Sequence, residues 1–198
     1  MLFRSDRANR EVLNVYERAY KSRPDLKDLR WRIEHAQHIS AQDIPRFGQL
    51  GVIASMQGIH ATSDAPYVLA RLGAKRAEEG AYVWQKLMKS GAIVANGTDV
   101  PVERIDPMAN FYATVTRKTK DGTVFFGDQK MSRAEALKSY TWNGAYAAKE
   151  ESLKGSLAPG KLADITVLSK DIMTIPEDQI PSARAVYTIV GGKIAFQR

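Results

Sequence analysis

Side chains that can bind a metal ion or move a proton follow three predicted strands. Glu34-His35 follows the first strand, Gln57 and His60 follow the second, and Thr98-Asp99 follows the third. In parallel α/β proteins the loops at the carboxyl ends of the strands converge on one cavity, and functional side chains gather there. We therefore expect that His and Asp side chains from adjacent strand ends could bind one divalent metal ion at this end of the sheet.

Imidazole and carboxylate groups suit Zn²⁺ or a similar divalent ion. The chain contains no cysteine, so His, Asp and Glu are the remaining candidate ligands. A water molecule on such an ion has its pKa lowered toward about 7, and a neighbouring carboxylate can accept its proton. Structural alternatives stay open, because a histidine at a strand end is often only hydrogen-bonded and an aspartate after Gly-Thr often caps a helix.

Strands and helices alternate through the first half of the chain. Apolar spacing predicts a helix over residues 6–20, a strand over 29–34, and a short helix that Ser40 caps and that ends between residues 48 and 51. An apolar strand over 52–56, a helix near 82–88 and a strand over 92–95 follow. Continuous apolar strands that alternate with helices indicate a parallel sheet covered on both faces.

The second half of the chain changes character near residue 153. Two helices are predicted over 107–115 and 132–148, the latter opened by the capping box Ser132 to Glu135. Strands over 165–168, 185–190 and 193–197 follow, the last two joined at Gly191-Gly192 as a hairpin. We therefore divide the chain into an α/β part, 1–152, and a β part, 153–198.

Composition excludes several classes of protein. The 198 residues carry a formal charge of +7 and are 44% hydrophobic, which is neither a disordered, a collagen-like nor a membrane-spanning composition. The basic residues are spread out, and the densest run, Arg117 to Lys120, is interpreted as a solvated loop rather than a nucleic-acid surface. Residues 1–10 lack the apolar run of a signal peptide. A cytoplasmic protein without a nucleic-acid or membrane partner is expected.

Several segments resemble, in order and in approximate spacing, motifs of the amidohydrolase superfamily, and most closely its branch known as amidohydrolase family 3. They are Arg32–Gln37, Gly97–Val102, Ile105–Pro107 and Thr114–Arg117. Two later segments resemble the part of such chains that leaves a TIM barrel and enters a small β-sandwich, namely Ser139–Ala145 and Gly155–Asp164. The resemblance runs over nearly the whole chain.

The resemblance implies a metal-dependent hydrolase that cleaves amide or other non-peptide C–N bonds by attack of metal-activated water. It implies the C-terminal part of a TIM barrel, strands 6 to 8 with their helices, followed by strands of the sandwich. His35 matches a metal ligand, and Asp99 matches a metal ligand that is also the general base. Gln57 and His60 match a segment that lines the substrate site, and His38 matches no ligand position. The implied cofactor is a divalent metal, zinc by resemblance, and the implied partner is a small amide-like substrate.

Other ligands of the family have no counterpart in this sequence, because its histidines are His35, His38 and His60 and Leu2 aligns with a missing one. The chain therefore resembles a C-terminal fragment, with a non-catalytic binding or assembly module as the alternative. Three barrel strands cannot close, so the faces of Ile33, Ile53 and Ile93 are expected to lose their cover, and an N-terminal half or self-association is expected to supply it. With two ligands the chain alone is expected to bind Zn²⁺ weakly and not to catalyse. Metal-dependent activity of the chain alone would overturn this expectation and imply replacement ligands from Glu34, His38, His60 or a second subunit.

Overall fold

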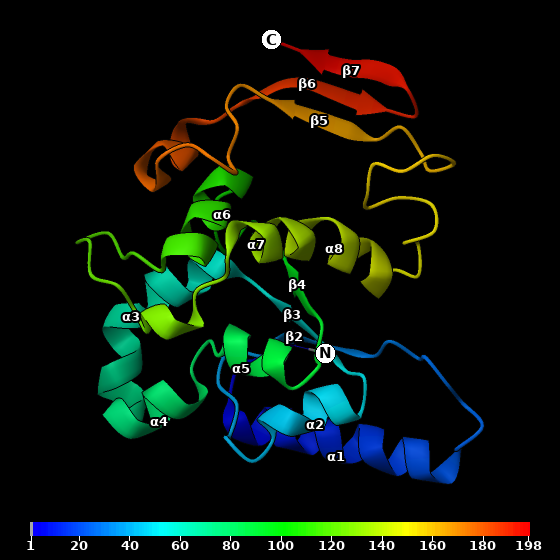
Figure 1. Ribbon diagram of the computed structural model, residues 1–198. Coiled ribbons are helices and arrows are strands. Elements are labelled where there is room, and N and C mark those ends of the chain that lie inside the picture. Colours follow the sequence, from blue (N-terminus) through cyan, green and yellow to red (C-terminus); the bar gives the residue numbers. More distant parts are fainter. Residues whose placement is uncertain (1) are drawn as a thin grey trace.

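The protein is described by a computed structural model that covers residues 2–198, with side chains from residue 4 onward (Figure 1). A parallel sheet forms its centre, in the order β1-β2-β3-β4. The strands are β1 (Leu2–Phe3), β2 (Arg32–His35), β3 (Ile53–Met56) and β4 (Val94–Asn96). All three pairings are parallel, with Ile33 opposite Ala54 and Ala54 opposite Val94. The predicted parallel α/β core is confirmed. Leu2, which aligns with a missing ligand, has a side chain outside the described part.

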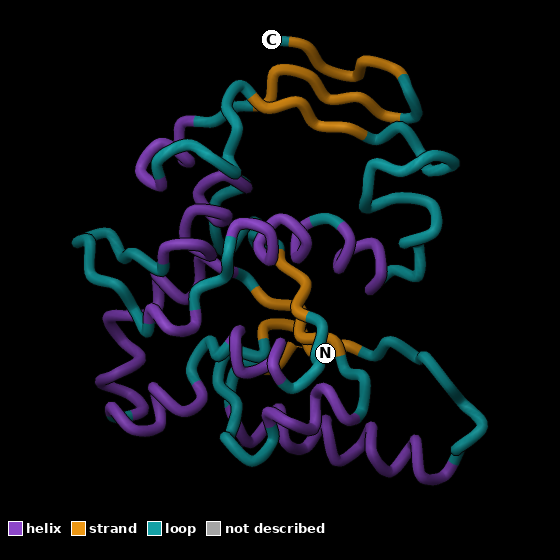
Figure 2. The backbone as a smooth tube through the Cα atoms, in the orientation of Figure 1, coloured by secondary structure: helices purple, strands orange, loops and turns teal. Residues whose placement is uncertain are grey.

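Helices surround this sheet. In Figure 1, α1, α2 and α5 lie on one side of the parallel strands, while α7 and α8 lie on the other. The helices of the described chain are α1 (Asp6–Ser22), α2 (Ile44–Gln49), α3 (Gly58–Leu72), α4 (Ala74–Gly80), α5 (Trp84–Lys89), α6 (Pro107–Thr116), α7 (Arg133–Tyr140) and α8 (Trp142–Ala147). Figure 2 shows how loops connect the short strands to these helices. The helices thus pack on both sides of the sheet. Loops follow the carboxyl ends of its strands.

The two faces of the parallel sheet differ in polarity. Ile33, Ala54 and Val94 are opposite one another and belong to the buried apolar core. Arg32 is opposite Ile53, on the other face, and pairs there with Glu34 at 2.7 Å. The expectation that Ile33 and Ile53 share one uncovered face is wrong, because neighbouring strands place them on opposite faces and both are fully buried.

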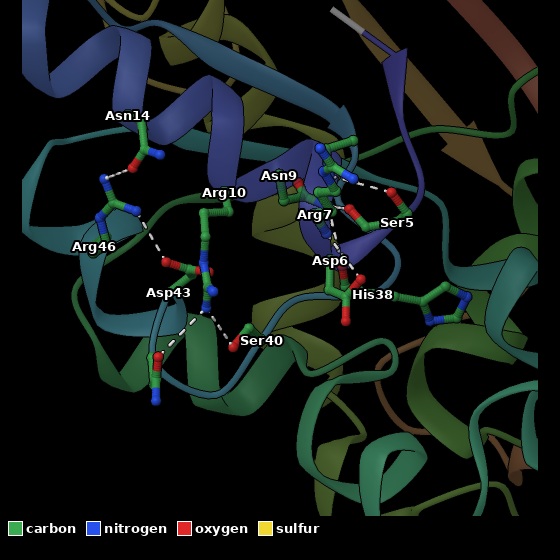
Figure 3. A network of polar contacts seen from close by, with 12 residues as sticks. Ser5, Asp6, Arg7, Asn9, Arg10, Asn14, His38, Ser40, Asp43 and Arg46 are labelled. Carbon is green, nitrogen blue, oxygen red and sulfur yellow. Dashed lines mark hydrogen bonds and ion pairs between the residues drawn. The ribbon is translucent and has the colours of Figure 1, made fainter.

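Polar contacts fix the segment that follows β2 against α1 (Figure 3). Asp43 accepts hydrogen bonds from Arg10 Nε at 2.7 Å and from Arg46 Nη1 at 2.9 Å. Ser40, the predicted cap of α2, instead accepts a bond from Arg10 Nη2, and α2 begins after Asp43. The predicted cap is wrong because the Ser40 hydroxyl is used by α1, 30 residues away in the sequence.

One long helix predicted over residues 132–148 is two helices in the structure. The capping box of Ser132 and Glu135 is confirmed at the start of α7. The helix breaks at Thr141, where φ is −111° and ψ is −86°. The Thr141 hydroxyl donates to the carbonyl of Leu137, four residues back, a local bond that competes with regular helix geometry.

Arg117 contradicts the interpretation of its basic run as a solvated loop. Its side chain is fully buried, and its guanidinium donates to the carbonyl oxygens of Tyr82 and Phe125 and lies 4.4 Å from the Trp84 ring centroid. Burial lowers the pKa of Arg117. The pattern of charged residues in the sequence did not predict that Arg117 is buried. The Tyr82 and Phe125 carbonyls that it contacts approach it only in the folded chain.

The C-terminal strands form a second, separate sheet. It is antiparallel, in the order β5 (Ile165–Leu168), β6 (Ala185–Val190) and β7 (Lys193–Gln197), and it lies at the top of Figure 1. The predicted hairpin across Gly191-Gly192 is confirmed, with φ of +55° and +77° that suit a glycine turn. The domain boundary at residues 152–153 stays a prediction. No helix in residues 2–198 is long and apolar enough to cross a membrane.

Gly48 is expected to tolerate no side chain. A Cβ atom built there lies 1.8 Å from the backbone oxygen of Ser90, where α2 meets the end of α5. Gly48→Ala should destabilise the protein by about 1–3 kcal/mol through overpacking. Gly144→Ala in α8 is the control, because no described atom lies within 4 Å of its added Cβ; it should stabilise the helix by about 0.5–1 kcal/mol. Urea unfolding of both variants measures the difference, and equal stabilities would contradict this packing.

Candidate metal centre

His35 ends β2 and turns inward. Its φ of 70° and the φ of 42° at Ala36 bend the chain away from the strand direction. The imidazole is 4% exposed, and its Nδ1 lies 2.9 Å from Oε1 of Gln57. The amide oxygen can only accept, so Nδ1 carries the proton and Nε2 is free to bind an ion.

His60 lies in the first turn of α3, directly after β3 and Gln57. The sequence reading, a loop segment, is wrong here: Pro66 and Gly58 hid a 15-residue helix, and the imidazole is 2% exposed. Nδ1 lies 3.2 Å from the amide nitrogen Nε2 of Gln37. Burial lowers the pKa of His60, and the positive charge of Arg4 lowers it further. The ring is therefore kept neutral and able to act as a ligand.

Asp99 follows β4 and faces both histidines. Its Oδ2 lies 3.6 Å from His60 Nε2 and 3.8 Å from His35 Nδ1. Arg4 Nη2 lies 3.6 Å from the same oxygen. The alternative role of a helix cap does not apply to Asp99, because the next helix, α6, begins at residue 107 and is capped by Asp106.

His35, His60 and Asp99 form one cluster, which we call the metal cluster. One ligand atom from each lies within 4.8 Å of the others. His60 Nε2 and Asp99 Oδ2 are buried and have no hydrogen-bond partner in the described part of the chain. These donors fit a divalent ion such as zinc, which binds histidine nitrogen and carboxylate oxygen. The structure thus adds a third group to the two ligands expected from the sequence.

Asn110 connects the start of α3, which carries His60, to the loop after β4, which carries Asp99. It is fully buried on α6, accepts a bond from the Ile59 backbone N–H at 2.6 Å and donates to the Gly97 carbonyl at 2.6 Å. The first N–H groups of a helix lack partners within it, so Asn110 caps α3 from another element. Nothing in the sequence spacing singled out this residue.

A cavity of about 400 Å³ lies beside the metal cluster. Gln37, which contacts His60, and Arg4, which contacts Asp99, both line it. Its other walls come from the start of α1 and from α3, and include Asp64, Tyr67 and Arg71. Its position is suitable for a small molecule next to the cluster.

His38 and Glu34 stay outside the metal cluster. Glu34 pairs with Arg32. The His38 ring packs edge-on against Tyr82, with centroids 5.7 Å apart, and burial lowers its pKa although Asp64 and Asp6 oppose that shift. The structural role predicted for His38 agrees with this packing.

Acid is expected to destabilise the metal-free protein partly through His38. Its folded-state pKa lies below the unfolded value of about 6.5, so the unfolded chain binds more protons. The free energy of unfolding should therefore fall as the pH drops through this window, with His60 adding to the effect. His38→Gln should show a shallower pH dependence in urea unfolding between pH 7 and pH 5. Equal slopes in both proteins would contradict the assignment.

Comparison with known proteins shows the family of this chain. The family model described as "Amidohydrolase family" matches residues 2–196. The chain is similar to Protein LONG AFTER FAR-RED 3 of Arabidopsis thaliana, with 38% identity over 95% of this chain and 32% of that protein. It is also similar to N-substituted formamide deformylase of Arthrobacter pascens, with 25% identity over 94% of this chain and 34% of that protein.

A solved structure supports the fold. An uncharacterized metal-dependent hydrolase from Pyrococcus horikoshii OT3 superposes with a TM-score of 0.76 and 28% identity, over 89% of this chain and 35% of that one. The chain thus spans about a third of the length of these relatives. Because the family model matches almost every residue, the chain belongs to the amidohydrolase superfamily, in its family 3 branch.

Proposed function

We propose that this chain carries part of the active site of a metal-dependent hydrolase that cleaves amide or other non-peptide C–N bonds. The observation that carries the proposal is the meeting of His35 and Asp99 at the carboxyl end of the parallel sheet, 3.8 Å apart. Both residues hold a divalent ion, which we propose is zinc. The name of the formamide deformylase supports C–N cleavage, because removal of a formyl group from nitrogen breaks such a bond.

Asp99 has the chemistry of a general base in this site. When bound, a divalent ion lowers the pKa of a neighbouring water molecule and so provides a nucleophile at neutral pH. With such an ion bound, Asp99 would accept the proton of the attacking water as the water oxygen bonds to the carbonyl carbon of the substrate. Asp99 would then pass that proton to the leaving nitrogen as the C–N bond breaks. One carboxylate would therefore serve both proton transfers.

The neighbours of the cluster position the reactants. We propose that Gln57, at the substrate side of the site, orients His35 through its bond to Nδ1. The adjoining cavity, which Arg4 and Gln37 line, receives the small amide-like substrate.

The remaining length of the relatives suggests where further parts of the site come from. We propose that β1 to β4 correspond to the last part of a TIM barrel, with β2, β3 and β4 as its strands 6 to 8. Residues 153–198 then correspond to one part of a small β-sandwich. An N-terminal segment or a second copy of the chain would complete both units. A non-catalytic binding or assembly module remains the alternative, and a hydrolysis assay separates the two.

The test is hydrolysis of a panel of N-formyl, N-acyl and cyclic amides by the metal-free chain and by the chain loaded with one equivalent of zinc. With three candidate ligands, the ligand count no longer argues against turnover by the chain alone, since catalytic zinc sites commonly have three protein ligands. We expect zinc-dependent product release above that of zinc in buffer, and its loss after chelation. A zinc-loaded chain that hydrolyses none of the panel, both alone and together with a separately expressed N-terminal half from the same locus, would contradict the proposal and favour the non-catalytic module.

A further inference from the structure

We propose that His60 is a third protein ligand of the metal ion, through Nε2, so that these 198 residues bind one zinc-class ion by themselves. This replaces the substrate contact expected for His60 from the sequence. The inference rests on the proposed function for the class of ion.

The spacing of the donor atoms suits a shared ion better than a direct hydrogen bond. His60 Nε2 and Asp99 Oδ2 are 3.6 Å apart, which is too long for a hydrogen bond between them. Two donors on a tetrahedral zinc, each at about 2.0–2.2 Å from the ion, are about 3.3–3.6 Å apart. One donor atom of His35 lies within 4.8 Å of a donor atom of each of the other two residues, so His35 is close enough to belong to the same set.

Two buried polar atoms of the cluster lack hydrogen-bond partners, and a bound cation would satisfy them. His60 is 2% exposed, and neither its Nε2 nor Asp99 Oδ2 has a hydrogen-bond partner within the described residues. Leaving one buried polar atom unpaired costs about 1–3 kcal/mol. An ion between these atoms satisfies both. The guanidinium of Arg4, also 3.6 Å from Asp99 Oδ2, is half exposed and contributes little against it.

The second nitrogen of His60 faces an amide group. A histidine that binds metal through Nε2 keeps its proton on Nδ1 and donates it to an oxygen. In the structure the amide nitrogen Nε2 of Gln37 lies 3.2 Å from Nδ1. A 180° rotation of that amide, which exchanges its nitrogen and oxygen, would let Nδ1 donate to Oε1. Gln57 already presents its oxygen to Nδ1 of His35.

The first experiment measures zinc affinity of the metal-free chain in competition with a chromogenic chelator, without substrate. We expect one zinc per chain. His60→Gln should weaken binding by about 100-fold or more, since loss of a mere supporting contact costs only about 10–100-fold. His38→Gln is the matched control, because His38 is also a largely buried histidine but lies outside the cluster, and its affinity should stay unchanged. Equal zinc affinity of His60→Gln and the unaltered chain would overturn the inference.

The second experiment avoids any folding defect of a variant. In ¹⁵N-labelled unaltered protein, zinc should shift the imidazole nitrogen resonances of His35 and His60 and leave those of His38 in place. A shift confined to His35 would overturn the inference. If His60 responds to zinc but no amide is hydrolysed, the proposed function fails alone. If hydrolysis depends on zinc but His60 does not respond, the inference fails alone.

Discussion

Asp99→Asn is expected to lower kcat/KM for zinc-dependent amide hydrolysis by about 1,000-fold or more. The change removes a carboxylate that is both a proposed ligand and the proposed proton acceptor, and general-base catalysis by itself contributes about 10²–10⁴-fold. Asn has nearly the same shape, and Asp99 Oδ2 has no hydrogen-bond partner in the described chain, so the fold should survive. Initial rates at saturating zinc measure the effect.

The control for this variant is Asp121→Asn. Asp121 lies in the exposed turn between Lys120 and Gly122, away from the metal cluster, and its carboxylate bonds only locally, to Thr119 and Thr123. Its rate should equal that of the unaltered chain. An Asp99→Asn variant that keeps full zinc-dependent activity would exclude Asp99 as the base.

Asn110→Ala is expected to have the largest effect on stability among the polar changes near the site, about 2–4 kcal/mol. The substitution leaves the Ile59 N–H and the Gly97 carbonyl without their partner inside the protein, and an unpaired buried group costs about 1–3 kcal/mol. Because Asn110 joins the start of α3, which carries His60, to the loop of Asp99, zinc affinity should also fall, by about 10-fold or more. Urea unfolding and chelator competition measure the two effects.

Asn14→Ala is the matched control for Asn110. Asn14 accepts one bond, from Arg46 Nη2 at 2.9 Å, and is partly exposed on α1. Water can replace that bond, so the loss should stay below about 1 kcal/mol. Similar losses in the two variants, or an unchanged zinc affinity in Asn110→Ala, would show that Asn110 does not hold the two loops together.

Local patterns in the sequence determined most of the elements. Apolar runs predicted β2, β3 and β4, the Gly191-Gly192 turn predicted the hairpin, and Ser132 with Glu135 predicted the start of α7. The resemblance to the family singled out His35 and Asp99, their places after parallel strands predicted that they meet, and the structure brings them together. These features follow from residues close in sequence, or from the rule that parallel strands end at the same edge.

Tertiary structure alone decided the features that depend on distant segments. Arg117 is buried because two carbonyls and an aromatic ring from other segments surround it. His60 joins the metal cluster because Asn110, 51 residues from Ile59, holds the start of α3. A histidine in a Gly- and Pro-containing segment carries no local sign of helix or burial. His60 follows β3 and Asp99 follows β4, so the two side chains meet only when these strands pair in parallel.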